Sequence, residues 1–141
     1  MGLNYMDNTI NKKDLYNEWI EIADGDYDLA PKVFDSHWPK QHVRICFNCQ
    51  QAAEKYLKGF LAYNGEEIAK THILQELLDV CIKYDDEFEA LRDKCKYLSP
   101  FAVQIRYPNN TFDITEVESK KALEYAKEII DFVKSKMKDR I

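Results

Sequence analysis

The stretch from Ile45 to Leu61 constrains the fold of this chain more than any other. It contains no proline, and its single glycine, Gly59, lies near its end. Its apolar residues recur mostly three or four positions apart, which at about 100° per residue places them on one side of a helix. These residues are Cys46, Cys49, Ala53, Tyr56, Leu57 and Phe60. The stretch therefore predicts a helix with a broad face toward the core.

The polar residues of this stretch fall on the opposite side of the predicted helix, with Gln51, Glu54 and Lys58 most nearly in line. Glu54 and Lys58 are four residues apart, in the order that makes a favourable ion pair worth roughly 0.2–0.5 kcal/mol. Such pairs usually belong to a solvated helix surface, which is the simplest interpretation of this face. Taken alone, the pattern predicts a helix in a bundle and no activity.

Length and composition fit one globular domain, expected over residues 1–141 with its core at about 12–138. The chain has 141 residues, of which 45% are hydrophobic and 32% charged. No apolar run approaches the ~20 residues of a membrane helix, and the first residues lack the pattern of a signal peptide. We therefore expect a cytoplasmic protein without membrane contact. The net charge of −5 argues against binding to bulk nucleic acid.

Five helices are expected along the chain, at about 12–30, 40–63, 72–83, 87–98 and 115–138. Pro31 is expected to end the first helix, and Asn64 and Gly65 the second. Thr71 is expected to cap the third, and Thr115 to cap the last together with Glu118 three residues on. Residues 99–112 hold two prolines and form the one irregular segment of unusual content. No strand alternation appears, so the sequence predicts an all-α, antiparallel up-and-down four- or five-helix bundle.

The first helix carries a stripe of apolar residues that we expect to face the core. Asp26 falls on the same stripe, and a carboxylate there is costly unless it is paired or hydrogen-bonded. Asp26 is therefore a candidate for a defined role. The stripe comprises Leu15, Trp19, Ile22, Ala23, Leu29 and Ala30.

The four cysteines are expected to be reduced core thiols. Cys46 and Cys49 form a C-x-x-C pair, which elsewhere can indicate zinc or redox chemistry. Here the pair lies on the apolar side of a predicted helix, without a second such pair or a neighbouring histidine. Cys81 and Cys95 lie on the apolar sides of two other predicted helices. We expect no metal and no cofactor.

Four segments, in this order and spacing, resemble the HEPN domain family (higher eukaryotes and prokaryotes nucleotide-binding). The resemblance covers about Leu15 to Val133, and its most specific part is the second segment. The segments are Trp19-x-x-x-Ala23-x-x-Asp26, Gln50-Gln51-Ala52-Ala53-Glu54-Lys55-x-Leu57-Lys58, Thr71-His72-x-Leu74-x-x-Leu77 and Arg106-Tyr107-Pro108.

The resemblance implies a helical bundle that is often dimeric and is commonly encoded beside, or fused to, a minimal nucleotidyltransferase. Some members bind nucleotides. Another branch comprises metal-independent ribonucleases or toxins, which carry an arginine followed after four to six residues by a histidine. None of the three histidines here, His37, His42 and His72, has an arginine at that distance before it. The resemblance therefore favours the branch without this ribonuclease motif.

The leading hypothesis is a non-catalytic module that binds a nucleotide, a nucleotidyltransferase partner or both, as one half of a toxin–antitoxin-type pair. We expect it to form a homodimer. Lys58 and Arg106 are expected to meet phosphate oxygens and Tyr107 to stack on a base. Two alternatives stay open: that Arg106 neutralises a carboxylate inside the bundle, and that His72 simply opens a helix. The candidate ligand-binding residues are Asp26, Gln51, Glu54, Lys58, His72, Arg106 and Tyr107.

The alternative function is a metal-independent ribonuclease toxin with a non-standard site. Metal-free RNA cleavage needs a general acid or base and a cation that stabilises the charge on phosphorus. His72 and Arg106 would supply these groups from distant segments. Nothing in their spacing requires that arrangement, so no residue is assigned a catalytic role.

Overall fold

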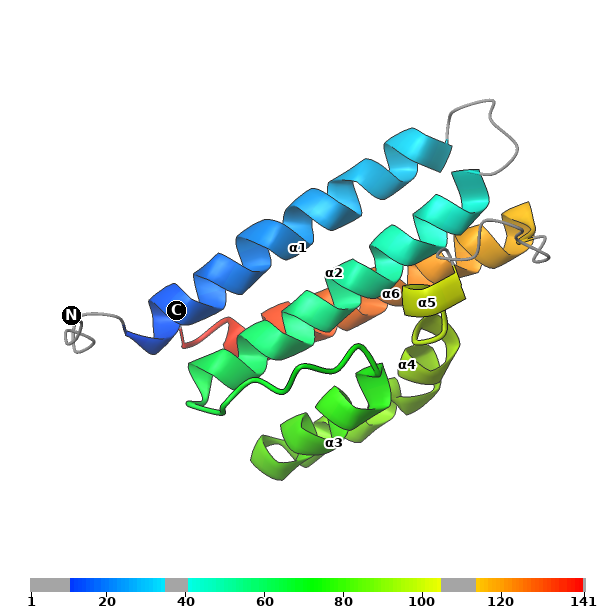
Figure 1. Ribbon diagram of the computed structural model, residues 1–141. Helices are drawn as coiled ribbons and strands as arrows, with labels where there is room; N and C mark the ends of the chain where they lie inside the picture. The colour runs from blue at the N-terminus through cyan, green and yellow to red at the C-terminus, as the bar shows by residue number, and fades with distance from the viewer. Residues whose placement is uncertain (1–10, 35–40, 105–113, 141) are drawn as a thin grey trace.

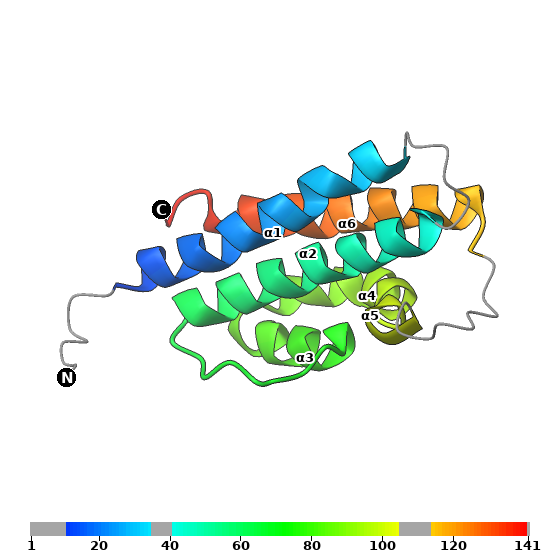
Figure 2. The same ribbon diagram turned by 45° about the horizontal axis from the view of Figure 1, so that its top comes forward.

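The computed structural model describes residues 11–34, 41–104 and 114–140, and the regular structure in these ranges is helical (Figure 1). The long helices α1 (Lys12–Phe34), α2 (Gln41–Tyr63) and α6 (Glu116–Met137) lie side by side in both views (Figure 2). The shorter helices lie along the other flank of α2. They are α3 (Leu74–Tyr84), the 3-10 helix η2 (Asp86–Leu91), α4 (Arg92–Leu98) and α5 (Phe101–Gln104). The prediction of an all-α bundle is confirmed.

Helix α2 is the centre of the bundle, and it is buried on its polar side as well as on its apolar side. The expectation of a solvated polar face is wrong, because Gln50, Glu54 and Lys58 are all buried. α1 packs along α2, and the segment before α3 crosses the same polar face. Because α2 is surrounded in this way, it does not have one solvent-exposed face and one buried face. Its charged residues must find partners inside the protein.

Gly59 allows α1 and α2 to approach each other closely. A Cβ atom at this position would lie 3.1 Å from Ile20 Cδ1 and 3.2 Å from Trp19 Cβ. Both distances are shorter than ordinary van der Waals contact, so with a side chain here the neighbouring atoms of α1 would have to move by a few tenths of an ångström. The glycine near the end of α2 is therefore explained by packing rather than by helix termination.

The apolar stripe expected to face the core from α1 lies largely at the surface. Leu15, Ile22 and Leu29 are exposed, and among the stripe members whose side chains the structure describes only Ala23 is in the buried core. The Ala30 side chain lies outside that description. A second stripe on α1, led by the buried Tyr16 and including the half-buried Ile20 and Tyr27, packs on the core instead. The two stripes adjoin on the helix, and periodicity alone does not reveal which of them meets a neighbour.

Two predicted helix limits were wrong. α1 continues through Pro31 to Phe34, although this proline cannot donate a backbone hydrogen bond. α3 begins at Leu74, two residues later than expected, because the Thr71 hydroxyl accepts from the Ile73 amide and not from deeper in the helix. The Leu74 amide donates instead to Ser99 Oγ at 2.9 Å, so a residue from the end of α4 caps α3.

The end of α2 reverses the chain. Gly65 has a φ of +80°, the left-handed conformation that glycine adopts without strain. Its amide bonds to the Ala62 carbonyl, and the Glu66 amide bonds to the Leu61 carbonyl, which together form a Schellman motif. The predicted stop at Asn64 and Gly65 is confirmed, and the chain then runs back alongside α2 to the start of α3 (Figure 1).

The second half of the chain closes the core. The predicted helix over 87–98 is split into η2 and α4, because Asp85 accepts from the Glu87 amide and starts a tighter turn. Thr115 and Glu118 form the predicted capping box of α6. Phe88 lies between Phe60 and Phe132, at ring-centroid distances of 4.5 and 4.9 Å. These three rings join α2, η2 and α6.

All four cysteine thiols are buried and unpaired with one another. Burial raises the pKa of Cys46 to about 12 and that of Cys95 to about 12. Burial also raises the pKa of Cys49 and of Cys81, so all four thiols are held in the unreactive protonated form. Within the described ranges, no group of three His, Cys, Asp or Glu side chains is arranged to hold a metal ion.

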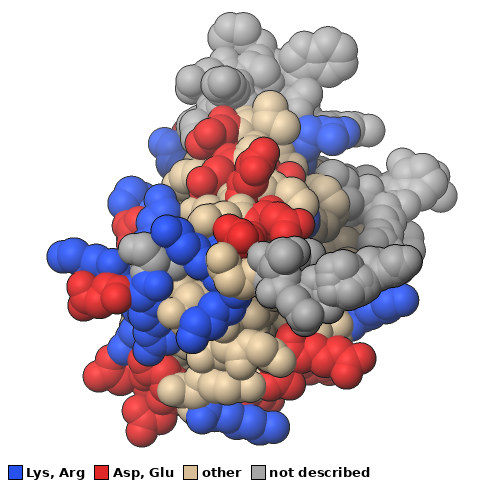
Figure 3. Space-filling model, turned by 90° about the vertical axis from the view of Figure 1, so that its left-hand side faces the viewer, with Lys and Arg blue, Asp and Glu red and all other residues tan. Residues whose placement is uncertain are grey.

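The surface carries both signs of charge. Figure 3 views the end of the bundle where α1 begins and α6 ends, and it shows Lys and Arg side chains gathered on one side with Asp and Glu around them. Cations at a helix C-terminus are favoured by the helix dipole, and Lys136 is also paired with Asp85 at 2.9 Å and with Glu87.

None of the described helices has the length and apolar character to cross a membrane.

Candidate functional site

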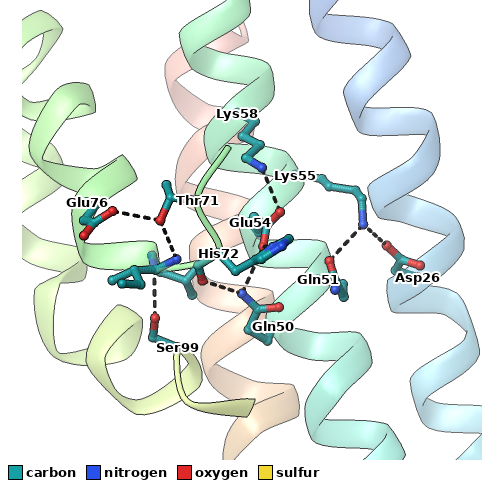
Figure 4. A network of polar contacts seen from close by, with 12 residues as sticks. Asp26, Gln50, Gln51, Glu54, Lys55, Lys58, Thr71, His72, Glu76 and Ser99 are labelled. Atoms are coloured by element: carbon teal, nitrogen blue, oxygen red, sulfur yellow. Dashed lines mark hydrogen bonds and ion pairs between the residues drawn. The ribbon is translucent and has the colours of Figure 1, made fainter. Parts of the chain in front are cut away.

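The chain reversal after α2 brings His72 back to Glu54. Glu54 lies ten residues before Asn64, about 15 Å along the helix. The eight residues from Gly65 to His72 span up to roughly 27 Å when extended, so the segment can cover this distance. His72 Nδ1 lies 2.9 Å from Glu54 Oε1, as Figure 4 shows. The two residues are adjacent in space although eighteen positions separate them.

Glu54 is the hub of the site. Its side chain is 3% exposed, and its carboxylate accepts from Lys58 Nζ at 2.9 Å and from Gln50 Nε2 at 3.2 Å, besides its contact with His72. Burial alone would raise the pKa of Glu54, but the hydrogen bonds from Lys58, His72 and Gln50 outweigh it and leave the pKa below its ordinary value. The carboxylate is therefore charged inside the bundle at neutral pH.

Lys58 forms a buried ion pair with Glu54. Its side chain is 8% exposed, and its amine also lies 5.7 Å from the centre of the Trp19 ring on α1. The pair and the aromatic ring together neutralise and cover the ammonium group. A direct contact between Lys58 and a ligand phosphate would require the amine to leave Glu54.

A second polar cluster joins α2 to α1 beside the first. Lys55 Nζ donates to Asp26 Oδ2 at 3.0 Å and to Gln51 Oε1 at 3.1 Å (Figure 4). Asp26 therefore has the partner that its position required. Lys55 and Gln50 were absent from the predicted set, although both lie within the string from Gln50 to Lys58 that carried the family resemblance.

Gln50 holds the connecting segment against α2. Its amide nitrogen donates to Glu54 and to the His72 carbonyl oxygen at 3.0 Å, which fixes the orientation of the amide group. The side chain is fully buried, and its Oε1 has no hydrogen-bond partner among the described residues. A buried acceptor without a partner costs about 1–3 kcal/mol, so this oxygen makes the position of Gln50 energetically costly.

The structure brings together five of the seven candidate residues in two adjoining clusters. Glu54, Lys58 and His72 form one, and Asp26 and Gln51 meet at Lys55 in the other. Arg106 and Tyr107 lie outside the described residues, as does the expected ion pair of Arg106 with Asp26 or Glu54. Both acids already have cationic partners on α2.

The chemistry available at this site centres on His72, whose side chain is 51% exposed. A carboxylate only accepts hydrogen bonds, so Nδ1 of His72 carries the proton in its contact with Glu54. In the neutral ring the lone pair then lies on Nε2. The site thus pairs a buried acid with an oriented imidazole at the protein surface.

These features define a class of protein: an all-α bundle whose central helix carries a buried acid–lysine pair beside a surface histidine. A family model for the HEPN domain matches residues 16–136, and the chain belongs to the HEPN domain family. The family is named for nucleotide binding.

Among solved structures, the chain is similar to the protein TT1696 from the bacterium Thermus thermophilus. The two are 28% identical, with a TM-score of 0.74, and the match covers 86% of this chain and 97% of that one. No curated protein matches the sequence at a significant level.

Proposed function

We propose that this chain is a non-catalytic nucleotide-binding module of the HEPN type, with His72 at the rim of its site. The observation that carries the proposal is the buried Glu54–Lys58 pair, held against His72 by Gln50. Membership of a family named for nucleotide binding supports the same conclusion.

The energetics of the pair support a functional role. Replacing a buried ion pair by apolar residues of similar volume is often neutral or stabilising, so such a pair is poor evidence for stability alone. Here the pair also orients a half-exposed imidazole and coexists with an unsatisfied amide oxygen on Gln50. The burial of Gln50, Glu54 and Lys58 next to one another is better explained by a binding site than by a contribution to stability.

Ligand recognition would divide between the described clusters and two residues outside the described ranges, Arg106 and Tyr107. The clusters pair two carboxylates with two ammonium groups, so they carry little net charge to attract phosphates. We assign phosphate binding to Arg106 and base stacking to Tyr107, as the sequence suggests. His72 would then hydrogen-bond the ligand through Nε2.

Calorimetric titration with ATP, GTP, CTP and UTP tests the proposal. We expect wild-type protein to bind at least one of them and His72→Ala to weaken that binding at least tenfold. His42→Asn is the matched control, because His42 lies twelve residues before Glu54, about 18 Å along α2. Wild-type protein that binds none of the four nucleotides would overturn the proposal.

The proposed macromolecular partners are a minimal nucleotidyltransferase, in a toxin–antitoxin-type pair, and a second copy of the chain. Co-expression with a nucleotidyltransferase encoded next to this chain tests the first. We expect the two to copurify and this chain to change the toxicity of its partner. Independent elution of the two proteins would count against that pairing.

One observation favours a second function, a metal-independent ribonuclease. Glu54 holds His72 by Nδ1 and leaves Nε2 outward, the arrangement in which an acid orients a histidine as a general base. Incubation of purified protein with RNA in the presence of a metal chelator separates the two functions. Cleavage that disappears in His72→Ala would establish the ribonuclease, whereas intact RNA is expected for the binding module.

A further inference from the structure

Helix α1 leaves an apolar stripe at the surface. Leu15 is 36% exposed, and Ile22 and Leu29 are each 53% exposed. They are seven residues apart, so they lie almost in line along the helix. Three of the seven exposed large hydrophobic residues in the described chain thus share one face of one helix.

The stripe belongs to a longer pattern with alternating spacings of three and four. Such spacing is that of the contact positions of a coiled coil. It is present over the whole length of α1 up to Leu29, while the residues that pack on the chain's own core follow a neighbouring stripe. The pattern consists of Lys12, Leu15, Trp19, Ile22, Asp26 and Leu29, which we call the α1 seam.

We infer that the α1 seam is a self-association surface, on which α1 of a second copy lies antiparallel. This inference rests on the homodimer named under the proposed function and specifies its interface. Contacts across a two-fold axis are reciprocal, so one seam serves both copies.

The charges of the seam select this orientation. Its one cation, Lys12, is at one end, and its one anion, Asp26, is near the other. A parallel pair would set each charge against its like, which is unfavourable, whereas an antiparallel pair sets Lys12 near the second copy's aspartate. The layers of an antiparallel coiled coil then join Lys12 to Leu29, Leu15 to Asp26 and Trp19 to Ile22.

Both charged side chains are at least partly exposed and so can contact a second copy. The Lys12 amine lies 4.7 Å from the centre of the Tyr63 ring, an exposed contact worth about 0.5–1 kcal/mol. Asp26 is 28% exposed beside Lys55. Since Trp19 and Asp26 touch the polar clusters of α2, the second copy would form one edge of the candidate site.

Light scattering on the full chain at tens of micromolar tests the surface. We expect the mass of a dimer for wild-type protein, the mass of one chain for Ile22→Glu, and an unchanged dimer for Val117→Glu. Val117 is the matched control, because it is 75% exposed on α6 and lies outside the seam. Circular dichroism checks that each variant keeps its helices.

The possible failures are distinguishable. A dimeric Ile22→Glu variant overturns the seam but not the homodimer, and monomeric wild-type protein overturns both. Neither result bears on nucleotide titration of the wild-type chain. Dissociation by Val117→Glu as well as by Ile22→Glu would also overturn the seam, because the effect would not be specific to it.

Disulfide trapping tests the orientation, since the native thiols are buried. After oxidation, a mixture of Lys12→Cys and Leu29→Cys chains should form a covalent heterodimer, and Leu29→Cys alone should remain non-covalent. A covalent dimer of Leu29→Cys alone would show parallel helices and overturn the antiparallel arrangement.

Discussion

The hydroxyl of Tyr56 lies 2.5 Å from Asp24 Oδ1 and joins the middle of α2 to α1. Burial, together with the hydrogen bond to this carboxylate, raises the pKa of Tyr56 well above its ordinary value, so the hydroxyl remains the donor. Asp24 and Asp26 therefore both bind α2, through a tyrosine and a lysine respectively. These two acidic residues attach α1 to the bundle.

Removal of the Tyr56 hydroxyl is expected to destabilise the fold. A hydrogen bond to a charged acceptor contributes about 1.5–3 kcal/mol, so Tyr56→Phe should lower the free energy of unfolding by that amount in urea. Tyr63→Phe is the control, because its hydroxyl makes only an exposed 3.4 Å contact with the Arg140 carbonyl oxygen. Equal losses in the two variants would contradict this role of Asp24.

A double-mutant cycle on Glu54 and Lys58 should show strong coupling. Glu54→Gln leaves a buried ammonium without its counter-charge, and we expect a loss of about 3–5 kcal/mol. Adding Lys58→Met should recover part of that loss. The exposed pair Glu116–Lys120 has the same spacing and order at 3.0 Å and is expected to couple by only about 0.2–0.5 kcal/mol. Similar coupling in the two cycles would indicate that Glu54 and Lys58 are solvated.

The lowered pKa of Glu54 predicts how stability depends on pH. The unfolded value is near 4.5, and the folded value lies below it. The carboxylate therefore contributes its full stabilisation above pH 4.5 and loses it as the pH falls through the folded pKa. Urea unfolding from neutral pH down to about pH 3 should show the stability of Glu54→Gln approaching that of wild type at the acid end. A constant difference across this range would contradict the assignment.

Arg106→Ala separates a ligand-binding arginine from a structural one. Asp26 and Glu54 already have lysine partners, so we expect the substitution to change stability by no more than about 0.5 kcal/mol. It should abolish nucleotide binding in the calorimetric titration. A loss of about 3–5 kcal/mol would instead show that Arg106 neutralises a buried carboxylate.

The cysteines are expected to be inert in the folded protein. The raised pKa values leave almost no thiolate at mildly alkaline pH, so native protein should react with a thiol reagent only as fast as it unfolds. Purified protein should contain no zinc. Stoichiometric zinc that is lost when Cys46 and Cys49 are both replaced by serine would contradict a purely structural role.

The long helices could be predicted from sequence because their signals are local. Apolar spacing located α2 and α6, and residues at the helix ends identified Gly65 and Thr115. The elements that pack against each helix are not determined by its local sequence. Leu15 and Tyr16 are neighbours in sequence, and only the position of α2 determines that Tyr16 is buried and Leu15 exposed.

The site was predictable in part for the same reason. Glu54 and Lys58 were identified as a pair because they are one turn apart. Their burial depends on α1 and on the segment that carries His72. The spacing of residues within α2 does not predict either contact. Gln50 and Lys55 were missed because each side chain also bonds a residue twenty or more positions away, and these bonds join α2 to the rest of the fold.

The segment between Gly65 and His72 contributes a site residue without being part of any helix of the bundle. The acid belongs to the central helix of the bundle, while the histidine belongs to a non-helical strip that Gln50 holds against α2. Substitutions in this strip would change the side chain that faces Glu54 without altering a residue of any helix. One scaffold can therefore offer several different surface chemistries through changes confined to a few connecting residues.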